Sequence, residues 1–360
     1  MAAAARGGKL ASRDGGLRGT IGAEAIMEAV RWGILSTSSH YKLRVHPPLS
    51  TLPEARIEAI ASRDGSRARE AAAGLGIGKA YGSYEELLAD PAVEAVYIPL
   101  PNDDHAPWTI RALEAGKHVL CEKPLALGSA EARTMADAAR ERGLLLMEAF
   151  MYRFHPRWRR AKAIVDSGEI GRVRAVHAWF SYSNADPGNI RNRLEAGGGG
   201  LYDIGCYAVS VARWLAGAEP DRALSLVLRD PGFKTDALSS GILDFPGGTR
   251  ATFTVSTQAF PFQRVEILGQ KGTLSLDLPF NAYPDVPLEI EVTTSLGARR
   301  VPSAPADQYG IMFAELSRAI RDGRPAPTPV EDGIANLGVL EALFRSERAG
   351  GWEPVSPRRV

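Results

Sequence analysis

The 360-residue sequence has few cysteines, no long apolar run and no excess of charge of either sign. Two cysteines, Cys121 and Cys206, give no disulfide framework, which indicates a reducing compartment and a cytoplasmic protein. No apolar run approaches the roughly 18 residues that a membrane span needs, so we expect no membrane partner. The 43 basic and 42 acidic residues give a net charge of +1 without a block of like charge, so we expect no nucleic-acid partner. We also assign no metal site.

Residues 1–28 lack the apolar core of a secretory signal and show no periodic pattern. They are rich in Ala, Gly and Arg, and Met27 stands directly before the first expected strand as a second possible start. We therefore predict a disordered leader or a mis-assigned start. A targeting peptide is the less favoured alternative, because acidic residues are present.

Between residues 29 and 150, short apolar runs alternate with Ala-, Glu- and Arg-rich helical patterns. We expect strands at 30–35, 56–62, 93–100, 118–121 and 144–147, and helices at 66–73, 83–89, 105–115 and 129–142. This alternation predicts an α/β Rossmann domain, in which a doubly wound parallel sheet binds a dinucleotide at its first strand-to-helix turn.

That first turn lacks the glycines of a dinucleotide-binding fingerprint. It begins at Gly33 and continues through Ser36, Thr37 and Ser38, all of which we assign to the cofactor. Serine offers a backbone N–H and a hydroxyl to phosphate, but it takes a positive φ less readily than glycine. The following segment, 41–48, contains two prolines, and we predict it to be irregular.

Polar residues follow the second and third expected strands. Ser62 and Arg63 suit the 2′-phosphate of NADP, whereas NAD would call for a carboxylate there. The alternative is that Arg63 only begins the next helix. Asn102 and His105 lie in a Pro-rich loop after the third strand and are candidates for the nicotinamide side of the cofactor; Asn102 is also a possible helix cap.

The stretch from His118 to Leu127 places a carboxylate, an amine and a proline where the fourth strand must end. Pro124 has no N–H to donate, so the strand stops there and Lys123 is held at the carboxyl edge of the sheet. In open α/β sheets this edge is the usual place for chemistry. The alternative is a solvated loop lysine beside a turn proline.

The pattern changes after residue 150. Arg153 and His155 lie in the crossover to a second domain and are candidate substrate contacts, with structural roles as the alternative. We expect strands at 173–182, 237–245, 249–257, 264–268, 272–278 and 288–294. Tight turns between them predict an α+β domain with an open, mainly antiparallel sheet, whose free face another subunit or helices must cover. We set this domain at 151–330 and a C-terminal helix and tail at 331–360.

A second polar stretch interrupts the strands of this domain. Four glycines, 197–200, run into a helix that carries Asp203 and Tyr207 on one face. The glycines would let another group approach closely; a flexible loop is the alternative. Arg191, shortly before them, is a further candidate substrate contact.

The strings HVLCEKPLAL, LPNDDHA, EAFMYRFHP and GGGGLYDIGCYAV, in this order, closely resemble the Gfo/Idh/MocA oxidoreductases, in particular the branch of D-xylose 1-dehydrogenase and dimeric dihydrodiol dehydrogenase. The resemblance spans about residues 30 to 347. It implies a Rossmann domain, an α/β C-terminal domain with an open sheet used for dimerisation, and NAD(P)-dependent hydride transfer on sugars or polyols. We therefore expect NADP, with NAD as the other possibility, and a homodimer.

The resemblance also implies roles for individual residues. It makes Lys123, Asp203 and Tyr207 catalytic, and it places Leu100 with Asn102 and His105 beside the nicotinamide. We also count Glu122 and Lys123, both in the Glu-Lys-Pro motif, with the cofactor-binding residues, and Asp203 and Tyr207 with the substrate contacts.

The resulting mechanistic hypothesis is oxidation of a sugar alcohol carbon by hydride transfer to the nicotinamide. Tyr207 would be the acid/base, and Lys123 would lower the pKa of Tyr207 or hold the substrate oxygen. Asp203 would hold Lys123 or a sugar hydroxyl. The alternatives are a dihydrodiol dehydrogenase, a keto-sugar reductase, and a catalytically silent dinucleotide-binding regulator.

Overall fold

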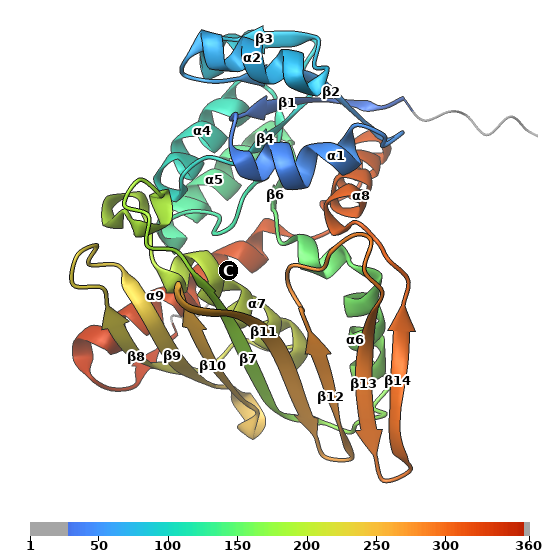
Figure 1. The fold of residues 1–360 in the computed structure, drawn as a ribbon, viewed down its shortest axis with the longest axis vertical. Coiled ribbons are helices and arrows are strands. Elements are labelled where there is room, and N and C mark those ends of the chain that lie inside the picture. The colour runs from blue at the N-terminus through green and yellow to red at the C-terminus, as the bar shows by residue number, and fades with distance from the viewer. Residues whose placement is uncertain (1–27, 356–360) are drawn as a thin grey trace, which may run out of the picture.

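The computed structural model describes residues 28–355, so nearly all of the leader discussed above lies outside the described residues. Figure 1 shows a smaller domain with helices on both sides of a sheet, stacked on a larger domain whose broad sheet has helices behind it. Within residues 28–355, no helix is both long and apolar enough to cross a lipid bilayer.

The N-terminal sheet is parallel and doubly wound, as predicted. Its strand order is β3-β2-β1-β4-β5-β6. The strands are β1 (Val30–Leu35), β2 (Ala55–Ala61), β3 (Lys79–Tyr81), β4 (Ala95–Ile98), β5 (His118–Cys121) and β6 (Leu146–Glu148). The main helices between them are α2 (Gly65–Leu75), α3 (Tyr84–Ala89), α4 (Asn102–Glu114) and α5 (Ser129–Arg142). The chain reverses its direction of winding between β1 and β4, so a crevice opens at their carboxyl ends.

The segment after β1 is helical, and the prediction that it is irregular was wrong. Helical backbone begins at Ser39 and runs through a π-helix (η1, Tyr41–Val45) into α1 (His46–Leu49). The hydroxyl of Ser38 accepts a hydrogen bond from the N–H of Tyr41 (3.3 Å) and caps this helix. Both prolines, which have no N–H to donate, lie directly after the point where the π-helix passes into α1.

The C-terminal domain contains a nine-stranded sheet with the order β14-β13-β12-β11-β7-β10-β9-β8-β15. Its strands are β7 (Val173–Ser183), β8 (Arg222–Arg229), β9 (Asp236–Asp244), β10 (Arg250–Ser256), β11 (Gln258–Gly269), β12 (Gly272–Asp277), β13 (Leu288–Thr294), β14 (Gly297–Ser303) and β15 (Glu353–Pro354). Only β7 and β10 pair in parallel, so the prediction of an open, mainly antiparallel sheet is confirmed. The sequence patterns missed β8, β14 and β15, as they missed β3.

One face of this sheet is covered by α6 (Pro156–Asp166), α7 (Cys206–Ala216) and α9 (Val330–Ala349). A further helix, α8 (Gln308–Asp322), joins the two domains. α8 packs back onto β1, where the ring of Phe313 lies 4.8 Å from that of Trp32 and Ser317 accepts a hydrogen bond from the Trp32 indole. α9 lies along β8 and also packs against α5.

Gly33 lies within β1, three positions before the turn to which we assigned it. It is buried, and a methyl group on its Cα would lie 2.5 Å from Cδ2 of Leu87 and 3.0 Å from Cγ1 of Val93. The assignment of Gly33 to the cofactor is therefore corrected: glycine is needed here for α3 to pack closely against the sheet.

We expect Gly33→Ala to destabilise the protein by about 1–3 kcal/mol, because the added methyl overpacks the β1–α3 contact. Gly74→Ala is the matched control: Gly74 is helical and exposed with nothing near its Cα, so alanine should stabilise by roughly 0.5–1 kcal/mol. Urea unfolding of both variants measures the effects. Equal stability of Gly33→Ala and the wild type would contradict the packing role.

Candidate active site

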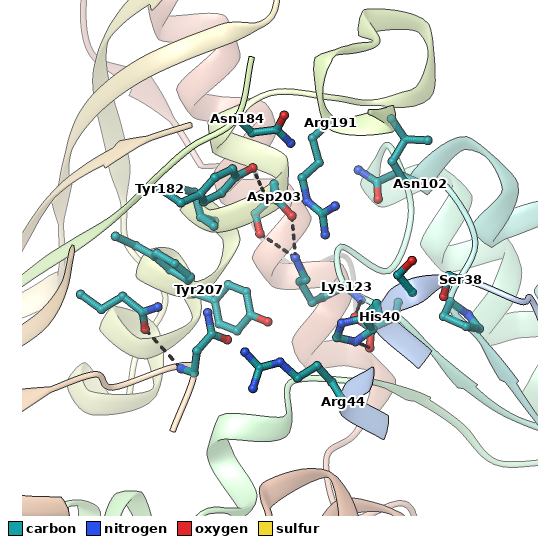
Figure 2. A pocket seen from close by; sticks show the side chains of 18 of the residues that line it. Ser38, His40, Arg44, Asn102, Lys123, Tyr182, Asn184, Arg191, Asp203 and Tyr207 are labelled. Carbon is teal, nitrogen blue, oxygen red and sulfur yellow. Dashed lines mark hydrogen bonds and ion pairs between the residues drawn. The ribbon is translucent and has the colours of Figure 1, made fainter. Parts of the chain in front are cut away.

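A cleft of about 610 Å³ lies between the two domains at the crevice beside β1, β4 and β5. The ends of these strands contribute Ser38, Leu100, Asn102, Glu122 and Lys123 to its wall. The opposite wall comes from the C-terminal domain and includes Tyr182, Arg191, Asp203 and Tyr207. Figure 2 shows Lys123 from one wall reaching toward Asp203 on the other.

The serine-rich turn after β1 fits a dinucleotide. Ser38 borders the cleft, while Ser36 and Thr37 lie buried beside it. The Ser36 hydroxyl accepts a hydrogen bond from the N–H of Ser38 (3.0 Å). Within residues 28–355 the only non-glycine residues with positive φ are Lys234 and Leu278, so the serines form this turn without backbone strain. The N–H groups of the following helix start have no partner inside the helix and suit a phosphate.

Ser62 and Arg63 lie at the carboxyl end of β2, next to β1. The Ser62 hydroxyl accepts a hydrogen bond from the N–H of Asp64 (3.3 Å), and Asp64 caps α2. Arg63 is exposed and does not itself begin the helix. Both residues lie outside the cleft wall, on the side where the adenosine end of a dinucleotide extends in this fold.

Of the three residues predicted to lie beside the nicotinamide after β4, two border the cleft and one is buried. Leu100 and Asn102 border the cleft, and the Asn102 amide donates to the carbonyl of Gly197 (2.8 Å). His105, in contrast, is fully buried, with Nδ1 2.8 Å from the Pro124 carbonyl and Nε2 3.0 Å from the Leu100 carbonyl. The prediction that His105 contacts the nicotinamide is corrected, because the ring is engaged by backbone and does not border the cleft.

Glu122 is held as a carboxylate. Tyr97 donates a hydrogen bond to its Oε1 (2.6 Å), and Nε2 of His40 lies 3.6 Å from the same oxygen. Burial alone would raise the pKa of Glu122, but His40, Lys123 and Tyr97 together lower it to about 2. Glu122 is therefore charged at neutral pH and lies beside the His40 ring near the start of the helix.

Lys123 and Asp203 form the central ion pair. The Lys123 ammonium donates to Oδ1 of Asp203 (3.0 Å) and to its backbone carbonyl (2.7 Å). The other carboxylate oxygen, Oδ2, accepts from Nε of Arg191 (3.0 Å) and from the hydroxyl of Tyr182 (2.6 Å). Burial would raise the pKa of Asp203, but Arg191, Lys123 and the Tyr182 hydrogen bond bring it well below its ordinary value. Burial would lower the pKa of Lys123, but the negative charge of Asp203 raises it.

Tyr182 is a site residue that our sequence analysis missed. It is the penultimate residue of β7, and strand alternation alone cannot show that its hydroxyl reaches Asp203 in the helical segment before α7. Arg44, one helical turn beyond His40, was also missed; it borders the cleft and lies over the ring of Tyr283 (5.2 Å).

Tyr207 borders the cleft but is not bonded to Lys123. Its hydroxyl donates to the sulfur of Met151 (3.4 Å), and the Lys123 ammonium lies over its ring, 5.0 Å from the centre. Burial raises the pKa of Tyr207 well above 10. The hypothesis that Lys123 lowers the pKa of Tyr207 is therefore wrong for this arrangement, and Tyr207 is a neutral phenol at pH 7.

The glycine run is a packed segment. A methyl group at Gly198 would lie 2.5 Å from the Arg191 carbonyl, and one at Gly199 would overlap the carboxyl group of Asp236. That carboxyl group accepts a hydrogen bond from the N–H of Leu201 (2.5 Å), at the start of the helical segment that leads into α7. The glycines therefore let Asp236 fix the segment that carries Asp203.

Arg153 and His155 do not border the cleft, and their assignment as substrate contacts is corrected. Arg153 is buried in an ion pair with Asp332 (2.9 Å) and donates to the hydroxyl of Ser210 (2.8 Å). His155 caps α6 by accepting from the N–H of Arg157 (3.1 Å). Both hold the crossover between the domains.

The fold and this cleft define an NAD(P)-dependent oxidoreductase, and comparison with known proteins gives the family. Residues 30–150 match the model of the oxidoreductase family with an NAD-binding Rossmann fold, and residues 158–275 match the GFO/IDH/MocA C-terminal domain. The chain belongs to the Gfo/Idh/MocA oxidoreductases, as the sequence motifs predicted.

Individual relatives cover most of the chain. An uncharacterized oxidoreductase from Rhizobium meliloti is 46% identical over 91% of this chain and 100% of its own. A D-xylose 1-dehydrogenase (NADP(+)) from Haloferax volcanii is 37% identical, covering 89% of this chain and 98% of its own. The crystal structure of a 3-ketoreductase from Actinomadura kijaniata, in complex with NADP and TDP-benzene, superposes with a TM-score of 0.84 at 30% identity, covering 88% of this chain and 98% of that one.

Asp236 should make stability depend on pH. Burial raises its pKa to about 6, compared with about 3.9 for a free aspartate. Between about pH 4 and 6 the native protein therefore keeps a proton that the unfolded chain has lost, so stability falls as the pH rises, by up to about 3 kcal/mol from this group.

Asp236→Asn keeps an acceptor for the Leu201 N–H but cannot ionise. We expect the variant to gain stability relative to the wild type as the pH rises from 4 to 7, measured by urea unfolding of both proteins at each pH. A stability difference that stays constant across this range would contradict the assignment.

Proposed function

We propose that this protein is an NADP-dependent oxidoreductase that transfers hydride between the nicotinamide and an alcohol carbon of a sugar or polyol, in the manner of a D-xylose 1-dehydrogenase. The observation that carries the proposal is the Lys123–Asp203 ion pair, held beside Tyr207 at the sheet edge where this fold binds a dinucleotide.

The cofactor would be held along the carboxyl edge of the N-terminal sheet. Ser36, Thr37 and Ser38 with the following helix start would bind the pyrophosphate, and Ser62 with Arg63 the 2′-phosphate of NADP. Leu100, Asn102 and Glu122 would border the nicotinamide. When bound, the nicotinamide supplies the acceptor or donor of hydride.

The proton would be managed by Tyr207 and Lys123. Because burial keeps Tyr207 protonated, its hydroxyl can donate to a substrate carbonyl oxygen in the direction of reduction. In oxidation the same hydroxyl must first release its proton to the solvent of the cleft, so that its oxygen can then take the proton of the substrate alcohol. The Lys123 ammonium, fixed by Asp203, would stabilise negative charge on the same oxygen. Arg191 and Tyr182 hold the carboxylate that orients Lys123.

The substrate part of the cleft suits a polyhydroxylated molecule. Besides Tyr182 and Arg191, its wall carries hydroxyl and amide side chains from the C-terminal domain: Asn184, Gln263, Asn281, Tyr283, Gln308 and Tyr309. A site rich in such groups selects substrates with matching hydroxyls, because an analogue that lacks one leaves a buried polar group unpaired.

Arg44 favours a keto-sugar reductase as the second candidate. Among the described residues it has no ion-pair partner, and its guanidinium borders the cleft, so a substrate with an anionic group such as a nucleoside diphosphate is compatible with this wall. The related 3-ketoreductase has TDP-benzene bound. A dihydrodiol dehydrogenase stays an alternative, whereas a silent regulator would have no need of the intact Lys123, Asp203 and Tyr207.

The experiment that decides among these is turnover with NADP(H) on a panel of aldoses, a trans-dihydrodiol and a nucleotide-linked keto-sugar. Oxidation of aldoses, D-xylose above all, would support the proposal. Preference for the nucleotide-linked substrate would favour the second candidate, and no turnover of any compound with NADPH bound would favour the regulator.

Lys123→Ala should abolish turnover while leaving the cofactor site intact. We expect kcat to fall at least about 100-fold, the usual range for a group acting on the proton of the reaction. Titration followed by nicotinamide fluorescence should show that the variant binds NADPH with the Kd of the wild type. Both proteins should bind NADH more weakly than NADPH. Lys162→Ala, in an exposed ion pair on α6, is the control and should keep full turnover. Full turnover by Lys123→Ala would refute the catalytic assignment.

We also propose that the protein is cytoplasmic and a homodimer. Both cysteines are buried free thiols, which suits a reducing compartment. The sheet face that α6, α7 and α9 leave uncovered carries Leu226 and Leu228 on β8 and Leu238 on β9, all exposed, with Leu228 paired to Leu238. An apolar patch of this kind favours burial against a second copy.

Leu226→Lys should weaken the dimer, because it places a charge in the proposed interface. Sedimentation velocity at micromolar concentration should then show a monomer. Leu296→Lys is the control, since Leu296 is even more exposed than Leu226 but lies in the β13–β14 turn, and this variant should stay dimeric. A monomeric wild-type protein would overturn the dimer proposal.

A further inference from the structure

One peptide group beside the catalytic lysine is held at both ends by buried side chains. The carbonyl of Pro124 lies 2.8 Å from Nδ1 of His105 and accepts from it in the tautomer that carries the ring proton there, and the N–H of Leu125 donates to Oε1 of Glu148 (2.8 Å). These two groups belong to the same trans peptide, so they point in opposite directions, and the two side chains hold the peptide plane from opposite sides.

Neither side chain has another function in the cleft. His105 comes from α4 and Glu148 from the end of β6, both are almost completely buried, and neither borders the cleft. Polar groups buried this deeply are costly unless they make hydrogen bonds. Burial and the nearby Asp332 raise the pKa of Glu148 to about 8, so its carboxyl group is neutral at pH 7 and still accepts through Oε1.

The surrounding elements are shaped around Glu148. In the first turn of α9, a methyl group at Gly333 would lie 2.8 Å from Oε2 of Glu148, so glycine is needed for the helix to approach the carboxyl group. Among the described residues Oε2 has no hydrogen-bond partner, so the hydrogen bond from the Leu125 N–H to Oε1 is the one that this carboxyl group makes there.

The position of Lys123 depends on this peptide. Lys123 lies one residue before the clamped group, and its side chain must cross the cleft to reach Asp203 of the other domain. A rotation of the Pro124–Leu125 peptide would redirect the backbone from which the ammonium extends. An error of about 1 Å in placing a catalytic group can cost on the order of 100-fold in rate.

We propose that Glu148 and His105 are positioning residues: they clamp the Pro124–Leu125 peptide and thereby aim the Lys123 ammonium at Asp203 and the substrate oxygen. The effect on turnover rests on the proposed role of Lys123, whereas the effect on the position of Lys123 does not.

The test compares Glu148→Met, which keeps the volume but removes the acceptor, with Glu148→Gln, which keeps the acceptor. We expect Glu148→Met to lower kcat at least about tenfold with the Kd for NADPH within twofold of the wild type, and Glu148→Gln to restore most of the loss. His105→Phe, which keeps a ring without a donor, should resemble Glu148→Met and serves if that variant folds poorly.

Met147→Ala is the matched control for a purely structural effect. Met147 is the fully buried neighbour of Glu148 on β6, and it makes no contact of this kind with the 123–125 turn. It should lower Tm at least as much as Glu148→Met while leaving kcat unchanged. An equal fall of kcat in Met147→Ala would overturn the proposal.

A crystal structure of Glu148→Met gives a readout independent of activity. We expect the Lys123 ammonium to leave the Asp203 carboxylate, from 3.0 Å in the wild type to beyond hydrogen-bonding distance. An undisturbed ion pair with wild-type kcat would refute the clamp. A displaced lysine with unchanged kcat would instead refute the catalytic role of Lys123 and leave the clamp standing.

Discussion

The ion pair between Lys123 and Asp203 is the interaction on which the rest of this structure depends. Its two side chains come from different domains, and each is only 11% exposed. Removing two charges from water is expensive, and the attraction between them offsets this cost only where further hydrogen bonds satisfy both groups. Arg191 and Tyr182 do this for the carboxylate, so the ion pair requires the glycine run, the end of β7 and the turn after β5 to meet at one point.

The residues proposed for catalysis and those proposed for cofactor binding lie at the same edge of the N-terminal sheet. The N-terminal domain supplies Lys123 and Glu122 from the end of β5, and the serine-rich turn at Ser38 lies nearby at the end of β1. The helix capped by Ser38 carries His40, whose ring pairs with Glu122. The start of the helix after β1 and the turn that carries Lys123 are thus linked through the Glu122 carboxylate, although neither contains the glycines of the usual fingerprint.

Much of the fold could be predicted because buried strands in a parallel sheet are largely apolar runs, which β4 and β5 show most plainly. The missed strands are short or lie toward sheet edges, where polar residues are tolerated: β3 has three residues, and β14 carries consecutive arginines. Within the site, Lys123, Asp203 and Tyr207 were found because they stand in long motifs. The sequence pattern near a strand end is the same whether a polar residue is buried or borders a cleft. This is why we misassigned His105, Arg153 and His155.

By itself, the sequence determined the order of most strands and helices and the family. It also identified the residues of the Glu-Lys-Pro motif and of the glycine-run motif that meet in the cleft. Only the tertiary structure decided what each polar side chain does, since hydrogen-bond partners and burial depend on segments far apart in the chain. Tyr182 reaches Asp203, Glu148 reaches Leu125, and burial keeps Tyr207 protonated despite the nearby ammonium. Such effects arise from desolvation and geometry, which no local pattern of residues encodes.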